Sequence, residues 1–333
     1  MRKCGFVIPY FGTFPRSFEV FLKSCAYNTN YDWLVFTDDH KEYDYPQNVK
    51  VHYIEFNDLK RIVDEKFGFH VAMDKPYKLC DLKPAYGFLF EEYLENYLSW
   101  GHCDIDTIMG NLDQFITDER LEKYDKIFCL GHMTIYKNTF ENNRVFMSRY
   151  KGKELYREVY TNPASCWFDE EWHDENNINQ IFLTQGRKVL QIDWSANFDI
   201  KYQNFRRVIY SKNKNGKWGY LQEGKKDALY IWDNGKTYRI SHVDGKLVKE
   251  EFLYMHFQHR NMKFAQSILD KDKFKIVPNS FLPLKKVPES VQEYKLIAKH
   301  TICFYSLQKS VTKLKKKINR FRKKIFRKVL SSE

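Results

Sequence analysis

The first 130 residues alternate between apolar runs and stretches in which apolar residues recur at helical spacing. Cys4–Pro9 predicts a buried strand, and the apolar positions from Phe18 to Cys25 predict a helix after it. Further strands are predicted at Trp33–Phe36, Val49–Ile54, Gly101–Ile105 and Lys126–Leu130. Strands that alternate with helices are typical of a mostly parallel α/β sheet covered on both faces.

Three hairpin signals follow one another after about residue 200. They are Asn215-Gly216, Asn234-Gly235 and Asp244-Gly245, each lying between β-rich runs. Asn-Gly and Asp-Gly supply the positive φ angles of tight hairpin turns. We therefore predict an antiparallel β-hairpin insert over 203–253, inside an α/β domain that spans 1–265. Residues 266–306 are predicted to form a linker and a terminal helix region.

The end of the chain carries a third pattern, in which an apolar residue recurs every three or four positions. This stripe consists of Leu307, Val311, Leu314, Ile318, Phe321, Ile325 and Val329. Basic residues fill most other positions, so 307–330 predicts a basic amphipathic helix of the kind that lies on an anionic membrane surface. A helix packed on the protein, a target helix for a calmodulin-like partner and a nucleic-acid-binding arm are the alternatives.

Most of the net charge of +12 lies in this last segment. Eleven of the 55 lysines and arginines lie from Lys309 onward, against one acid, so residues 1–308 carry a net charge of only +2. This distribution argues against a body that binds nucleic acid over a broad basic face. No run of 18 apolar residues predicts a membrane-spanning helix. The seven scattered cysteines include no Cys-x-x-Cys motif, which favours a reduced, cytoplasmic chain without structural zinc.

The first candidate for chemistry is Asp104-Ile105-Asp106, which directly follows an apolar strand. Two carboxylates at the carboxyl end of such a strand can hold a divalent cation and leave positions for phosphate oxygens. A short motif of this kind also occurs by chance, as Asp270-Lys271-Asp272 does in a polar, lysine-flanked stretch. A strand-end turn with solvated acids is therefore the alternative for Asp104 and Asp106.

His256 ends an apolar run after the hairpins and is a candidate third ligand, since Mn²⁺ accepts mixed nitrogen and oxygen sites. Arg260 and Lys263 follow closely and are placed to neutralise a diphosphate. The alternative for His256 is an ordinary packed histidine.

Two further polar groups stand in aromatic surroundings. Lys78, Asp81 and Lys83 lie in a helical stretch, where they form either a basic group aimed at phosphate or an ordinary surface ion pair. Asp169 and Glu170 follow Phe168, and acids beside an aromatic ring suit sugar recognition. Either acid is also a candidate catalytic base for an acceptor hydroxyl. A solvated acidic loop that caps the next helix is the alternative.

Together these motifs resemble GT-A glycosyltransferases, and more specifically a bacterial family of uncharacterised GT-A-like enzymes associated with capsule and exopolysaccharide synthesis. The resemblance covers about residues 4–265, and its Lys78 segment is also similar to a Lys-x-x-Asp helix of certain mannosyltransferases. A lysine is expected at the position of His259. The residues that carry the resemblance are Phe11-Gly-Thr-Phe-Pro, Asp32-Trp-Leu-Val-Phe-Thr-Asp-Asp, Pro76-Tyr-Lys-Leu-Cys-Asp-Leu-Lys-Pro-Ala-Tyr-Gly, Trp100-Gly-His-Cys-Asp-Ile-Asp, Leu130-Gly-His-Met and His256-Phe-Gln-His-Arg.

The resemblance implies a GT-A-like, Rossmann-like fold that transfers a sugar from a nucleotide-sugar, with UDP expected, to a hydroxyl of a glycan or lipid-linked acceptor. It implies a Mn²⁺ or Mg²⁺ ion on Asp104, Asp106 and His256, and a catalytic base at Asp169 or Glu170. Donor contacts are then expected from Pro9, Tyr10, Phe11, Thr37, Asp38, Asp39, Lys78, Asp81, Lys83, His132, Arg260 and Lys263.

This interpretation places the enzyme in the cytoplasm, peripheral on the inner face of the cell membrane, in cell-surface polysaccharide synthesis. A non-catalytic α/β scaffold with a membrane- or nucleic-acid-binding tail is the main alternative. A metal-dependent phosphoesterase is a third, which would need more carboxylate and histidine ligands near Asp104 than the sequence identifies.

Overall fold

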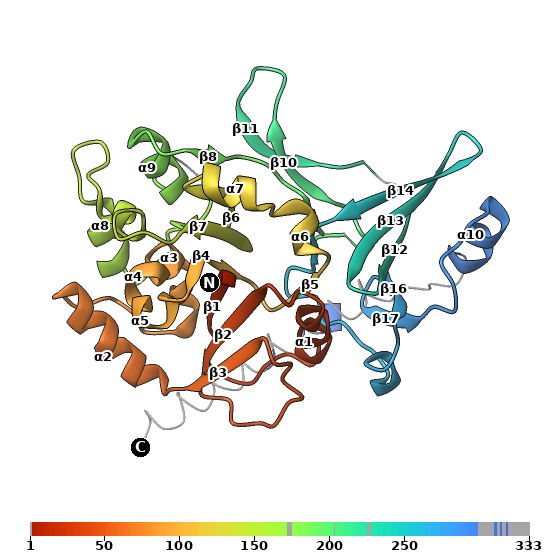
Figure 1. Ribbon diagram of the computed structural model, residues 1–333, viewed down its shortest axis with the longest axis horizontal. Helices are drawn as coiled ribbons and strands as arrows, with labels where there is room; N and C mark the ends of the chain where they lie inside the picture. Colours follow the sequence, from red (N-terminus) through yellow and green to blue (C-terminus); the bar gives the residue numbers. More distant parts are fainter. Residues whose placement is uncertain are drawn as a thin grey trace.

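The computed structural model describes residues 2–171, 175–202, 204–224 and 228–298, together with Ser310, Val311, Leu314 and Ile318. A seven-stranded sheet, ordered β3-β2-β1-β4-β7-β6-β8, forms its centre (Figure 1). The strands are β1 (Arg2–Pro9), β2 (Tyr31–Thr37), β3 (Val49–Tyr53), β4 (Tyr97–Cys103), β6 (Lys126–Leu130), β7 (Met133–Lys137) and β8 (Val189–Leu190).

All neighbouring strands in this sheet pair in parallel except β7, which runs antiparallel to both β4 and β6. The predicted α/β class with a mostly parallel sheet is therefore confirmed, and the five strands expected in the first 130 residues are present. Strand β4 ends at Cys103, two residues before the predicted end, so Asp104 begins the turn beyond it. Strand β7 was not predicted, and it follows β6 through the two-residue turn Gly131-His132.

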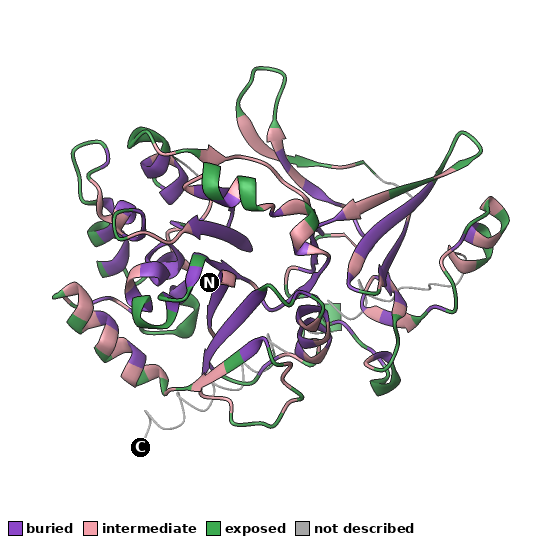
Figure 2. Ribbon diagram, in the orientation of Figure 1, coloured by how far each residue is buried: buried purple, intermediate pink, exposed green. Residues whose placement is uncertain are grey.

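Helices cover both faces of the sheet because β1 alternates its apolar side chains between two cores. Val7 packs with Val63 of α2 on one face, whereas Phe6 and Ile8 pack with Phe21 of α1 on the other. Figure 2 shows the buried strands between partly exposed helices. The helices that precede the insert are α1 (Phe18–Ala26), α2 (Phe56–Phe67), η1 (Pro76–Lys78), α3 (Leu79–Leu82), η2 (Lys83–Ala85), α4 (Tyr86–Leu89), α5 (Glu91–Leu94), α6 (Leu112–Phe115), α7 (Asp118–Lys123), η3 (Asn142–Met147), α8 (Leu155–Thr161) and α9 (Ile178–Thr184).

The predicted hairpins are confirmed as antiparallel strand pairs, with positive φ at Gly216, Gly235 and Gly245. Their strands are β10 (Val208–Lys212), β11 (Trp218–Gln222), β12 (Ala228–Asp233), β13 (Lys236–Val243) and β14 (Lys246–Phe252). Two further strands, β16 (Lys273–Val277) and β17 (Ser280–Pro283), complete a five-stranded sheet ordered β14-β13-β12-β16-β17. The stretch expected to be a linker thus supplies two strands, besides η4 (Gln266–Ile268) and α10 (Val291–Ala298).

A small three-stranded sheet connects the two large ones. It consists of β5 (Thr107–Met109), β15 (Tyr254–His256) and β9 (Ser195–Asn197). Strand β15 is antiparallel to β5 and parallel to β9, with His256 paired to Thr107 on one side and Asn197 on the other. This pairing brings three segments that are far apart in the sequence to the end of β4.

Among the described residues, no helix combines the length and the apolar character needed to cross a membrane. The basic helix predicted over 307–330 lies outside the described residues, apart from Ser310, Val311, Leu314 and Ile318.

Candidate active site

The turn from Asp104 to Asp106 is held in place by backbone contacts on three sides. The Asp104 amide donates to the carbonyl of His132, and the Thr107 hydroxyl donates to the Asp104 carbonyl at 2.7 Å. The Phe257 amide donates to the Asp106 carbonyl. The turn therefore joins β4 to β5 in a fixed geometry, and its two carboxylates remain available for the site.

The ring of His256 faces both carboxylates through one defined nitrogen. Its Nδ1 lies 3.0 Å from Oδ1 of Asn197, an atom that only accepts, so Nδ1 carries a proton. Its Nε2 lies 3.3 Å from Asp106 Oδ1 and 3.7 Å from Asp104 Oδ2. Ligand atoms of the three residues all lie within 4.8 Å of one another. The structure thus brings together the three predicted metal ligands, in a donor set of two carboxylates and one oriented imidazole.

Electrostatics within this cluster are strong because two of its members are buried. Burial lowers the pKa of His256, but the charge and hydrogen bond of Asp106 and the charge of Asp104 together outweigh burial and raise the pKa above its ordinary value. Burial raises the pKa of Asp106, but the charge and hydrogen bond of His256, together with the charge and backbone amide of His259, outweigh burial and hold the pKa well below its ordinary range. Asp104 is 33% exposed, so the cluster opens to solvent on the side of this carboxylate.

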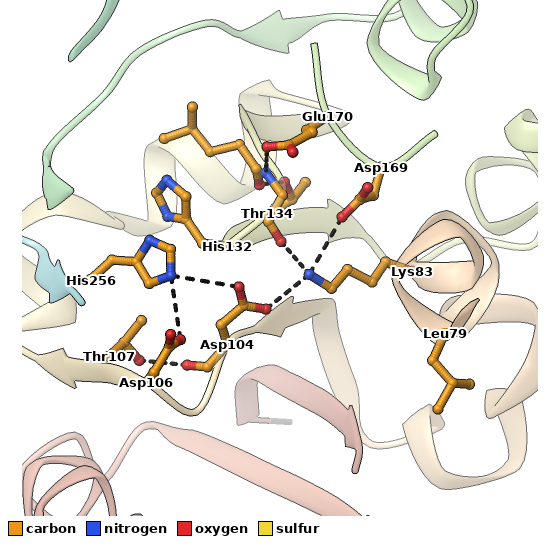
Figure 3. A network of polar contacts seen from close by, with 12 residues as sticks. Leu79, Lys83, Asp104, Asp106, Thr107, His132, Thr134, Asp169, Glu170 and His256 are labelled. Atoms are coloured by element: carbon orange, nitrogen blue, oxygen red, sulfur yellow. Dashed lines mark hydrogen bonds and ion pairs between the residues drawn. The ribbon is translucent and has the colours of Figure 1, made fainter. Parts of the chain in front are cut away.

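Lys83 links the cluster to a second pair of acids (Figure 3). Its Nζ donates to Asp104 Oδ1 at 2.9 Å and to the Gly131 carbonyl at 2.6 Å, and lies 3.4 Å from Asp169 Oδ2. Burial lowers the pKa of Lys83, but the charges of Asp104 and Asp169 hold it well above its ordinary value. The ammonium therefore stays charged and bridges carboxylates from two distant parts of the chain.

Asp169 and Glu170 lie against the backbone of Gly131. Glu170 Oε2 accepts from the Gly131 amide at 3.3 Å. A Cβ at Gly131 would lie 2.8 Å from Asp169 Oδ2 and 3.0 Å from Glu170 Oε2, so a larger residue here would displace one or both carboxylates. Burial raises the pKa of Asp169 to about 7, and burial also raises the pKa of Glu170. Both acids are thus part of the site rather than of a solvated loop.

His132 completes the wall beside His256. The two rings stack with centroids 4.4 Å apart, and His132 Nδ1 lies 2.7 Å from the Tyr254 hydroxyl. Burial lowers the pKa of His132 well below its ordinary value, so the ring is neutral. Its buried Nε2 has no hydrogen-bond partner among the described residues.

The strand ends predicted to hold a nucleoside lie at the same edge of the sheet, because β1, β2 and β4 run in parallel. Thr37 is fully buried, while Phe11 packs on Phe56 and is also buried. Asp38 accepts from the Gly12 amide, and Asp39 accepts from the Phe14 amide, so these acids hold the loop after β1. Pro9 and Tyr10 are half-buried. Burial, together with the charges of Asp106 and Asp39, raises the pKa of Tyr10, whose ring stacks on Phe14.

Three of the predicted donor-binding residues, Lys78, Asp81 and Arg260, make their contacts away from the cluster of Asp104, Asp106 and His256. Lys78 Nζ binds Asp81 and two backbone carbonyls, so neither residue of this buried pair points at the cluster. Arg260 donates to the carbonyls of Asp199 and Tyr202 and is buried by these contacts. Lys263 is exposed, and its backbone pairs with the β17 region. The charged groups of Lys78 and Arg260 are hydrogen-bonded to backbone carbonyls, so they are not directed at a phosphate in this structure, whereas the phosphate role expected for Lys263 stays a prediction.

Three residues of the site were missed in the sequence. Asn197 orients His256 and Tyr254 binds His132. Gly131 leaves space for the carboxylates of Asp169 and Glu170 because it has no side chain. Tyr254 precedes His256 by two positions in one strand, so the alternation of side chains indicated that both face the same side. Asn197 lies about sixty residues before His256 in a three-residue strand and carried no such signal.

No curated protein matches the chain in a sequence comparison. The chain does match a family of unknown function over residues 6–285, a range that includes every residue of the site described above. The protein therefore belongs to the family of unknown function DUF6625.

Proposed function

We propose that the protein is a metal-dependent glycosyltransferase of the GT-A type, which moves a sugar from a nucleotide-sugar to a hydroxyl of a glycan or lipid-linked acceptor. The observation that carries the proposal is the convergence of Asp104, Asp106 and His256 at the carboxyl end of a mostly parallel sheet. Ligands of open α/β sheets bind at this edge.

The donor chemistry supports a bound cation. Asp104, Asp106, Asp169 and Glu170 bring four carboxyl groups to one site, but burial raises the pKa of Asp169 and Glu170, which leaves Asp104 and Asp106 as the acids for a cation, with the imidazole of His256 beside them. A set of carboxylate oxygens with one imidazole suits Mn²⁺ better than Mg²⁺. Asp104, Asp106 and His256 are the residues that would hold the ion. When bound, such an ion acts as a Lewis acid on the phosphate oxygens of a leaving nucleoside diphosphate.

The remaining residues supply acid–base and electrostatic functions. Asp169 has a pKa of about 7, which suits a general base near neutral pH. In an inverting transfer it takes the proton of the acceptor hydroxyl while that oxygen bonds to the sugar carbon and the bond to the diphosphate breaks. Lys83 keeps its charge beside this reaction and stabilises negative charge that develops there. The neutral His132 stacks on the His256 ring and supports its position beside the two carboxylates.

A panel of nucleoside diphosphates and nucleotide-sugars, each with Mn²⁺ or Mg²⁺, tests the proposal by thermal shift. We expect protection by one nucleotide together with metal, and its loss in Asp106→Ala. Absence of a response to every nucleotide overturns the proposal. Product analysis then separates transfer, which yields a glycosylated acceptor, from phosphoester hydrolysis, which releases phosphate from the nucleotide.

We further propose that 307–330 holds the enzyme at the anionic inner face of the cell membrane, where a lipid-linked acceptor would lie. The basic and apolar pattern of this segment supports the proposal. Co-sedimentation with vesicles that contain acidic lipids should occur with the full chain and be lost in a chain that ends at residue 306. Equal sedimentation of both chains would refute it.

A further inference from the structure

A buried ion pair lies behind the candidate active site, in the same short helical segment as Lys83. Lys78 Nζ lies 2.8 Å from Asp81 Oδ2, and the two side chains are 3% and 0% exposed. The ammonium also donates to the carbonyls of Val159 at 2.9 Å and Ala164 at 2.8 Å. All three donors of Lys78 are thus used, two of them on a distant part of the backbone.

Asp81 continues these contacts along the same distant segment. Its carboxylate accepts from the Cys166 amide at 3.0 Å and from the Phe168 amide at 3.2 Å. Trp167, between these amides, has a φ of 51°, a left-handed conformation that bulky residues rarely adopt. Asp81 therefore holds both ends of an unfavourable backbone turn.

The residue after this turn is Asp169, the candidate base. Phe168 is fully buried, and its carbonyl accepts from the Ile178 amide at 2.9 Å, so the main chain is held up to the base itself. Three residues of the segment 78–83 contact the loop, the first being Lys78 through the Ala164 carbonyl. Asp81 binds the backbone before Asp169, and Lys83 lies 3.4 Å from the Asp169 carboxylate.

We propose that Lys78 and Asp81 are positioning residues, which hold 164–168 so that Asp169 reaches Lys83 and Gly131. This inference rests on the proposed function only for the role of Asp169 as base. Burying an ion pair is costly unless its remaining polar groups are satisfied, and here three of the four backbone groups that satisfy them, at Ala164, Cys166 and Phe168, belong to the loop that carries Asp169; the fourth, the Val159 carbonyl, lies in α8. A pair that served the helix alone would lie on the surface, where an i, i+3 contact needs no other partner.

Asp81→Asn tests the proposal, because it keeps the shape of the side chain but removes its charge and one accepting oxygen. Asp32→Asn is the matched control. Asp32 is 1% exposed and lies 2.9 Å from Lys50, but it stands near the start of β2, at the opposite end of the sheet from the site. The double variant Lys78→Met with Asp81→Asn removes both charges and replaces Asp81→Asn if the unpaired lysine prevents folding.

The first measurement needs no substrate. Hydrogen exchange of peptides over 164–171 should be at least about tenfold faster in Asp81→Asn, and should change by less than about twofold in Asp32→Asn. Mn²⁺ affinity, measured by titration with the metal alone, should stay within about threefold of wild type, because Asp104, Asp106 and His256 are unchanged. Unchanged exchange over 164–171 overturns the proposal.

The second measurement separates positioning from a general loss of stability. With the nucleotide-sugar that wild type turns over fastest, kcat should fall at least about tenfold in Asp81→Asn while KM for the donor stays within about threefold. A rise in KM without a fall in kcat overturns the positioning role. A wild-type chain that turns over no nucleotide-sugar overturns the proposed function instead, and the exchange experiment still decides whether Asp81 holds the loop.

Discussion

Replacing Asp106 by asparagine should abolish metal binding with little change in shape. The Asp106 carboxylate lies 3.3 Å from His256 Nε2 and accepts from the His259 amide. The asparagine side chain keeps one oxygen for this amide but removes the charge that attracts a cation. We therefore expect a folded variant whose stability no longer responds to Mn²⁺.

The size of the effect follows from linkage. At a Mn²⁺ concentration of 100 times Kd, the wild-type protein gains about 2.7 kcal/mol. Even outer-shell partners of a metal ligand are worth about 10–100-fold in affinity, so losing one of three protein ligands should cost at least about 100-fold. At the same concentration, the variant then gains only about 0.4 kcal/mol. With about 2 °C per kcal/mol for a chain of this size, Tm should rise by about 5 °C in wild type and by less than about 1 °C in the variant.

Thermal unfolding with EDTA and then with excess Mn²⁺ measures this difference. Asp272→Asn is the matched control, since it removes an aspartate from the other Asp-x-Asp motif, where both acids are exposed. The Tm of Asp272→Asn should rise with Mn²⁺ by the same amount as the Tm of wild type. An equal Mn²⁺ shift in wild type and Asp106→Asn would refute the metal site, and so would the absence of any shift in wild type.

Three further predictions concern the same site. Below the raised pKa of His256, protons compete with metal, so Mn²⁺ affinity measured by titration should fall about tenfold per pH unit. Gly131→Ala places a Cβ 2.8 Å from Asp169 Oδ2, so turnover should fall at least about tenfold. The Mn²⁺ affinity of this variant should stay within about threefold of wild type. Unchanged turnover would contradict the packing argument. Burial raises the pKa of Asp169 in the folded protein to about 7, above its pKa in the unfolded chain. At any pH above the unfolded pKa, ionisation of Asp169 therefore lowers the stability of the folded protein. Asp169→Asn should accordingly be more stable than wild type at pH 8 by about 1–3 kcal/mol in urea unfolding, yet lose about 10²–10⁴-fold in turnover.

The position of Asp104 and Asp106 could be predicted from the sequence because it depends on a local pattern. An apolar strand that ends before Asp104 places the following turn at the carboxyl edge of the sheet, and the structure has this turn at that edge. The hairpins could be predicted for the same reason, since Asn234-Gly235 and Asp244-Gly245 favour the positive φ angles of a tight turn by themselves. The pairing of β15 with β5 and β9 was not predictable in this way, because strands of three residues are too short to show a period.

The contacts of Lys78 and Lys83 could not be predicted from the neighbouring sequence. Both are buried and both contact an aspartate, but Lys78 binds the backbone at 159–164 whereas Lys83 binds Asp104. Their angular separation does not follow from 3.6 residues per turn, because α3 lies between the 3₁₀ turns η1 and η2. Their partners come from loops 48 to 86 residues later, or from the end of β4. One segment can therefore hold a loop through its first lysine and contact the candidate reacting groups through its second.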